Sequence, residues 1–261
     1  MILFLAVFTF VAGAQAGTGT GTSNAFKVRP AASAAEQIDR AKELMRKMHQ
    51  TPPPAKFDLF AEAWSNLGLV RKVWPNDKNA FLRSGIMQAD LGAEFAAWPN
   101  VVQALVEVEP AAAKTDMEPQ VEQKLGQAYE RIGNVAEAEK HLLAAERAMH
   151  SAHSDRVQSQ EILTSLATLY SRQNKPQEAI RRFREAQELP GQQSINKVQF
   201  QLQIAEQAAH VSRDAAEHEL THLDEFVSAA RQTTLTPAEA TLLNDVVSHA
   251  QRLHNPPQRQ R

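Results

Sequence analysis

The string His218-Glu219-Leu220-Thr221-His222 is the arrangement in this chain whose residue types and spacing most directly suggest chemistry. Two histidines four positions apart on a helix place both imidazoles on one face, where they can bind Zn²⁺. The glutamate between them could then act as general base toward a metal-bound water. A third ligand is needed, and Glu239, 17 residues beyond His222, is the candidate. A zinc peptidase is therefore one hypothesis for function.

The residues around this string favour a structural helix instead. Apolar residues recur there at helical spacing, at Ala216, Leu220, Leu223, Val227 and Ala230. If that stripe faces the core, His218 and His222 turn toward water, where no cleft encloses a metal ion. Glu239 also follows Thr236 and Pro237 in the pattern of a helix capping box. We therefore expect no catalytic residue and no cofactor, and keep His218, His222 and Glu239 as a weaker alternative metal site.

The other candidate ligands give no second site along the sequence. His141, His210 and His249 lie on predicted helices without metal-ligand spacing. The chain has no cysteine, which excludes disulfides, thiolate catalysis and a lipid anchor on cysteine. The three tryptophans are expected to pack between helices rather than to form a ligand cage.

The composition indicates a folded helical chain. Hydrophobic residues make up 43% and charged residues 22%, which is ordinary for a globular protein. The chain has 10 glycines and 2 tyrosines and is rich in Ala, Gln, Glu and Leu, which favours helix over strand. A formal net charge of −2 lacks the excess of basic residues expected of a nucleic-acid-binding protein.

Residues 1–16 have the features of an export signal. An uncharged apolar run covers residues 2–14, and Ala14-Gln15-Ala16 fits the small-x-small pattern of a cleavage site. The run is shorter than the roughly 20 residues of a transmembrane helix. No Lys or Arg precedes it, so a retained N-terminal anchor stays open as the alternative. We expect cleavage after Ala16, no membrane span thereafter, and a periplasmic or secreted protein.

Four segments are expected along the chain. The signal occupies residues 1–16, a Gly-Thr-rich flexible spacer residues 17–31, a helical domain residues 32–254 and a basic tail residues 255–261. Within the domain, Pro52 to Pro54, Pro75, Pro110 and Pro190 are expected to mark helix ends.

Two segments of the helical domain repeat at an offset of 41 residues. The first carries Leu125, Gly126, Tyr129, Gly133, Ala138 and Ala145, and the second carries Leu166, Ala167, Tyr170, Asn174, Ala179 and Ala186. A further shift of 41 residues brings Gly85, Gly92, Ala97 and Ala104 into register. This pattern resembles the tetratricopeptide repeat (TPR), although the family's usual period is shorter. The resemblance implies an all-α solenoid of antiparallel helix hairpins, closed by a C-terminal capping helix after Thr236.

The resemblance also implies a binding surface. In this family the first helix of each hairpin lines the concave wall, and a protein or peptide partner binds there. The positions carried over are Leu82, Ile86, Asp90, Gln123, Gln127, Glu130, Arg131, Thr164, Thr168 and Arg172. The wall is expected to be apolar toward the N-terminus and polar further on. Arg131 and Arg172 could meet an acidic group or simply pair with nearby carboxylates. The implied function is a scaffold or adaptor outside the cytoplasm.

Overall fold

The computed structural model describes residues 28–151 and 155–254. The predicted signal at 1–16 and the basic tail at 255–261 lie outside the described residues, as does most of the spacer. Within the described residues the chain is built from helices and contains no strand. The eleven helices described are α1 (Ala34–His49), α2 (Ala55–Val73), α3 (Lys78–Glu94), α4 (Trp98–Ala112), α5 (Glu118–Arg131), α6 (Val135–Ser151), α7 (Arg156–Arg172), α8 (Pro176–Gln187), α9 (Ser194–Ala209), α10 (Arg213–Arg231) and α11 (Pro237–His254).

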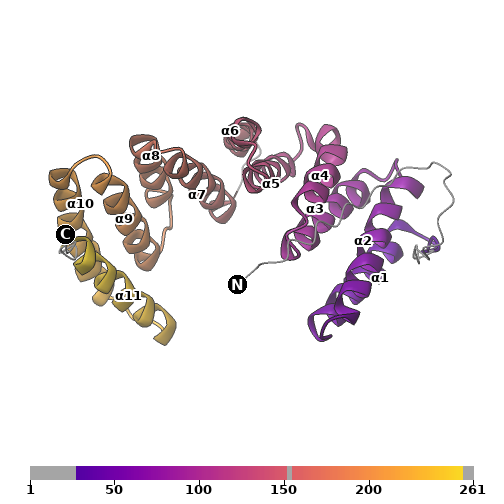
Figure 1. The fold of residues 1–261 in the computed structure, drawn as a ribbon, viewed down its shortest axis with the longest axis horizontal. Coiled ribbons are helices and arrows are strands. Elements are labelled where there is room, and N and C mark those ends of the chain that lie inside the picture. Colours follow the sequence, from indigo (N-terminus) through magenta and orange to yellow (C-terminus); the bar gives the residue numbers. More distant parts are fainter. Residues whose placement is uncertain (1–27, 152–154, 255–261) are drawn as a thin grey trace, which may run out of the picture.

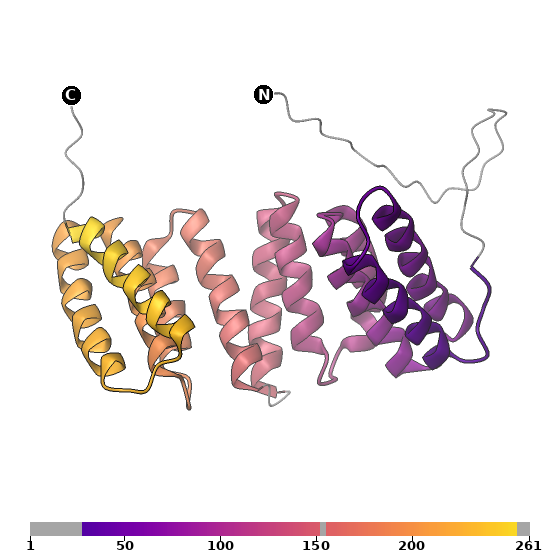
Figure 2. The same ribbon diagram turned by 90° about the horizontal axis from the view of Figure 1, so that it is seen from below.

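Consecutive helices pair into antiparallel hairpins that stack in one row (Figure 1). The pairs are α1–α2, α3–α4, α5–α6, α7–α8 and α9–α10, and α11 packs on α9 and α10 as the last element. Viewed from below, the hairpins stand side by side along the long axis (Figure 2). The predicted all-α solenoid with a terminal capping helix is confirmed.

The row of hairpins bends into an arch, and the first helix of a hairpin lies on its concave side (Figure 1). There α5 lies inside α6, and α9 lies inside α10. Contacts between alternate helices agree with this arrangement, because α3 touches α5 and α5 touches α7. The helices α1, α3, α5 and α7 therefore form a continuous inner wall that could carry a binding site.

Small residues bring the two helices of a hairpin close together. A Cβ atom added to Gly126 would lie 2.5 Å from Leu142 Cγ, so no larger residue fits between α5 and α6 without movement. Ala138 and Ala179, the first alanines of α6 and α8 in the repeat pattern, are fully buried. The turns between helices also match the pattern, since Gly133 and Asn174 have φ of 81° and 56°.

Helix ends follow the signals in the sequence at several points. The Thr236 backbone N–H donates to Glu239 Oε2 at 2.8 Å, and the Glu239 N–H donates to Thr236 Oγ1 at 3.3 Å. This capping box begins α11, as predicted. The Ser212 hydroxyl accepts from the Ala215 N–H and begins α10 in the same way.

Two details of the sequence interpretation are wrong. Gly92 was aligned with the turn residue Gly133, but it lies inside α3, against Val101 and Trp64. In the α3–α4 hairpin the turn residue with positive φ is Ala96, one helical turn after Gly92. Because the shift is one full turn, α3 still presents the same face to the inside of the arch. Pro110 does not end a helix either. It lies in the last turn of α4, where little helix remains for its missing N–H to disrupt.

Among the described residues, no helix combines the length and apolar character needed to cross a bilayer.

Candidate functional site

A polar hollow of about 460 Å³ lies between α5 and α7, the first helices of two successive hairpins. Its lining residues are Gln120, Gln123, Lys124, Gln127, Gln160, Glu161, Thr164 and Ser165. Four of the eight carry amide side chains, each of which can both donate and accept hydrogen bonds. Charged groups contribute only one lysine and one glutamate, so the hollow presents mainly neutral polar groups.

Polar pairs join the first helices across this wall. Lys124 of α5 forms an ion pair with Asp90 of α3. Gln127 Nε2 donates to Ser165 Oγ of α7 at 2.9 Å. Further along the same helices, Arg172 Nη1 lies 2.6 Å from Glu130 Oε1. These contacts join α3 to α5, and α5 to α7 across the hollow.

The structure brings part of the predicted groove together. Gln123, Gln127 and Thr164 line the hollow, while Asp90 and Glu130 pair with groups on the neighbouring helix. The hollow also includes residues that the family pattern did not select, namely Gln120, Lys124, Gln160, Glu161 and Ser165. Several of them lie one helical turn before a predicted position, so their side chains share its face.

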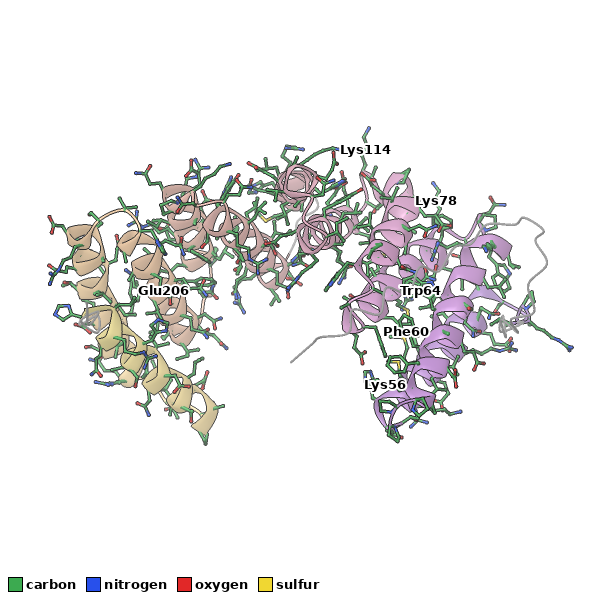
Figure 3. All side chains as sticks on the ribbon, in the orientation of Figure 1. Lys56, Phe60, Trp64, Lys78, Lys114 and Glu206 are labelled. Atoms are coloured by element: carbon green, nitrogen blue, oxygen red, sulfur yellow. The ribbon has the colours of Figure 1, made fainter. Side chains whose placement is uncertain are left out.

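Leu82 and Ile86 do not line an open wall, which corrects the expected apolar end of the groove. They are 4% and 7% exposed and belong to the core between α3, α4 and α5. Their side chains are covered by apolar residues of α4 and α5, Leu105 and Leu125 among them. An aromatic group on α2 supplies apolar surface nearby instead. Phe60 and Trp64 point from α2 toward the α3–α4 hairpin (Figure 3).

This aromatic group continues onto the end of α3. The rings of Phe60 and Phe95 have centroids 4.4 Å apart, and Phe57, 55% exposed, packs edge-on against Phe95. Trp64 lies against the backbone of Gly92, which confirms the expected packing role of this tryptophan. The group lies two helices away from the amide-lined hollow and is separate from it.

The remaining predicted groove residues have ordinary partners. Arg172 pairs with Glu130, so the simple ion-pair interpretation holds for this arginine. The guanidinium of Arg131 is exposed and lies 5.5 Å from the centre of the Trp98 ring. Thr168 donates its hydroxyl to the Thr164 carbonyl one turn earlier in α7. None of these three side chains forms a dedicated anion-binding site.

The segment that forms the hollow matches a known protein family. The family model for the tetratricopeptide repeat matches residues 119–190, which span α5 to α8. Residues 119–190 are tetratricopeptide repeats. The hollow between α5 and α7 thus lies within the TPR segment, and the TPR fold supports a protein-interaction scaffold in general. A search among curated proteins found no significant match.

Solved structures share the solenoid fold. Two structures of nearly identical TPR-like repeats, from a Podosopora anserina protein assigned as a kinesin light chain, match with a TM-score of 0.57 each. They are 16% and 15% identical to this chain, cover 77% and 78% of it, and are themselves covered to 98% and 100%. At this identity the likeness shows the fold alone. A structure of pilF from Pseudomonas aeruginosa is 16% identical, with 85% and 88% coverage and a TM-score of 0.47.

The His-Glu-x-x-His string lies on α10, beyond the matched TPR segment. Glu219 is only 7% exposed: Gln201 Nε2 donates to its carboxylate at 2.8 Å, and Arg184 of α8 donates as well. The imidazoles of His218 and His222 lie outside the core with ring centroids 4.7 Å apart. The carboxylate therefore points into the protein while the imidazoles point toward water, so the three do not share a site.

Glu239 does not complete a zinc site at this string. It caps α11, and the hydrogen bonds from Thr236 lower the pKa of its carboxyl. His222 Nδ1 lies 3.2 Å from Glu225 Oε2 on its own helix. Within residues 28–151 and 155–254, no group of three ligands at metal-binding distance includes His218 or His222. TPR proteins are typically non-catalytic, which agrees with this geometry.

A second histidine has the surroundings that the string lacks. His141 of α6 is 4% exposed, and its Nδ1 lies 2.7 Å from Glu122 Oε2 of α5. Glu109 of α4 and Glu137 of α6 also approach the imidazole, and the Tyr129 ring stacks on it at 5.2 Å. The sequence alone indicates no ligand set for His141, because Glu109 and Glu122 come from other helices. The four-residue spacing of Glu137 and His141 was the one local signal.

Proposed function

We propose that this chain is a scaffold that binds an extended segment of a partner protein along the concave face, in the hollow between α5 and α7. The observation that carries the proposal is the amide-rich lining of that hollow inside the TPR segment. An extended peptide presents N–H and C=O groups in alternation, and a glutamine amide can pair with either. Gln120, Gln127 and Gln160 supply such groups from α5 and α7. Gln127 Nε2 also donates to Ser165 and Gln160 Oε1 accepts from Gln192, while Gln123 is only 5% exposed.

The same lining indicates the kind of segment that fits. Lys124 is already paired with Asp90, and Glu161 is an exposed carboxylate at the other wall. No cluster of cationic groups faces the hollow to hold a terminal carboxylate or a phosphate. The partner segment is therefore an uncharged polar stretch, and the hollow binds it mainly through its backbone N–H and C=O groups. Phe60 and Phe95 offer a separate apolar contact for a longer partner.

Affinity capture with matched variants tests this proposal. The mature chain is used as bait, and the captured partner is then titrated against Gln120→Ala/Thr164→Ala and against Arg181→Ala. Each lost hydrogen bond costs about 1 kcal/mol, so the double variant should bind roughly 10-fold more weakly or worse. Arg181 has a 61% exposed side chain on α8 and serves as the control. Equal affinity of all three proteins would contradict the assigned surface.

The proposal includes a location outside the cytoplasm, in the periplasm or the secreted fraction. It is supported by the apolar run at residues 2–14 and the Ala14-Gln15-Ala16 pattern that follows. Cell fractionation with N-terminal sequencing tests it, and Gly17 is the expected first residue. An intact Met1 on a membrane-bound product would instead support the retained anchor. The proposal further holds that the chain has no peptidase activity of its own.

A further inference from the structure

We propose that Glu109, Glu122 and His141 form a binding site for a divalent transition-metal ion, with Zn²⁺ as the representative ion, at the junction of α4, α5 and α6. The three side chains come from three helices and two hairpins. One ligand atom from each lies within 4.8 Å of the other two. One imidazole nitrogen with two carboxylate oxygens is a donor set that suits zinc and its neighbours.

The distances around His141 Nδ1 match the size of such an ion. This nitrogen lies 2.7 Å from Glu122 Oε2 and 4.0 Å from Glu109 Oε1. Zinc bonds of about 2.0–2.2 Å in a tetrahedron place neighbouring ligand atoms roughly 3.4 Å apart. That separation falls between the two observed distances. Relative to His141 Nδ1, Glu122 would move outward and Glu109 inward by less than an ångström each, and water would complete the coordination.

The opposite edge of the imidazole is arranged as it is in metal sites. His141 Nε2 lies 3.5 Å from Glu137 Oε2. A metal ion on Nδ1 requires the ring proton to reside on Nε2, and a carboxylate facing that nitrogen stabilises this tautomer. Lys140 donates to Glu137 at 2.8 Å and helps to hold this carboxyl group beside the ring. The Tyr129 ring, stacked on the imidazole, fixes its orientation.

Charge and access are also suitable. The carboxyl groups of Glu109 and Glu122 lie beside a ring whose side chain is 5% exposed, and a bound divalent cation would balance their charge. The side chains of Glu109 and Glu137 are 34% and 37% exposed, so an ion can enter from that edge. Because Glu109 belongs to the preceding hairpin, the bound ion would tie α4 to the α5–α6 hairpin.

Zinc titration of the full chain tests the site, with the surface pair removed first. His218 and His222 can capture metal weakly, so the background is His218→Gln/His222→Gln. After dialysis against a chelator, calorimetry should show one equivalent of Zn²⁺ bound per chain. Glu122→Gln, Glu109→Gln and His141→Gln should each weaken binding by at least about 10-fold, and Glu137→Gln by about 10-fold. Glu178→Gln, an exposed glutamate on α8, is the charge-matched control and should bind normally.

Two outcomes would overturn the proposal. One is the absence of saturable Zn²⁺ binding in the background protein, which would mean that a proton rather than a metal ion joins His141 to Glu122. The other is binding that survives Glu109→Gln. This carboxylate is partly exposed, so its substitution should leave the fold intact, as circular dichroism would confirm. Bound Co²⁺ gives a second readout, because its visible absorption should be intense in the background protein and lost in His141→Gln.

Discussion

His141 and the His218–His222 pair lie in opposite kinds of surroundings. At the α4–α5–α6 junction one imidazole is buried against a tyrosine ring and meets carboxylates from three helices. On α10 two imidazoles lie outside the core, and the glutamate between them points inward. The string with the catalytic pattern thus has no enclosing site, while the histidine without a pattern has one. Burial and partners from other helices, rather than local spacing, decide what a histidine can do.

The largest expected effect is a difference in protein stability between substitutions in these two regions. His141→Ala removes the polar partner of buried Glu122 and the ring stacked on Tyr129. An unpaired buried charge typically costs about 3 kcal/mol, so the free energy of unfolding should fall by about that amount. His218→Ala and His222→Ala should each change it by less than about 0.5 kcal/mol. Urea denaturation in the presence of a chelator measures all three, and similar values would remove the distinction.

Helix packing gives the next largest difference. Ala138 and Ala179 are fully buried where two helices of a TPR hairpin cross, so Ala138→Leu and Ala179→Leu should each cost about 1–3 kcal/mol through overpacking. Ala229→Leu, on the exposed side of α10, is the matched control and should cost little. Thermal denaturation provides the comparison. Unchanged melting temperatures for the first two variants would mean that the close crossing is wrongly assigned.

Glu219→Gln distinguishes a structural glutamate from a catalytic one. The carboxylate is held by Arg184 and Gln201, so loss of its charge should reduce stability by about 1 kcal/mol. We expect the wild type to cleave no member of a peptide library, and the variant should cleave none either. Cleavage by the wild type that this one substitution abolishes would restore the zinc peptidase hypothesis.

The smallest expected effect on stability belongs to the hollow. Gln120→Ala and Thr164→Ala alter partly exposed side chains, so each should change the free energy of unfolding by less than about 0.5 kcal/mol. Their effect should appear in partner affinity instead. If either variant unfolds the protein, its side chain has a packing role, and the assigned helix face is wrong.

The fold was predictable because its signals are local. Helix periodicity, the Thr236–Glu239 capping box and the turn residue Gly133 each depend on a few neighbouring positions, and the structure confirms them. The hollow was only partly predictable. Gln123, Gln127 and Thr164 followed from the repeat register, whereas the opposing pair Gln127 and Ser165 depends on how two hairpins are spaced.

Two kinds of feature could not be predicted from one sequence. The burial of Leu82 and Ile86 depends on how α4 and α5 pack against α3. The cluster around His141 joins Glu109 and Glu122 across separate helices, at spacings that carry no meaning along the chain. Both required the three-dimensional arrangement of hairpins.

Hydrogen exchange tests the central claim, that the TPR hollow is the partner-binding surface, most directly. The protein is compared alone and saturated with its captured partner, by mass spectrometry of peptic peptides. The account predicts added protection in peptides covering α5 and α7, with α10 unchanged. Protection confined to α10, or spread over the convex helices α6 and α8 without α5 and α7, would contradict it.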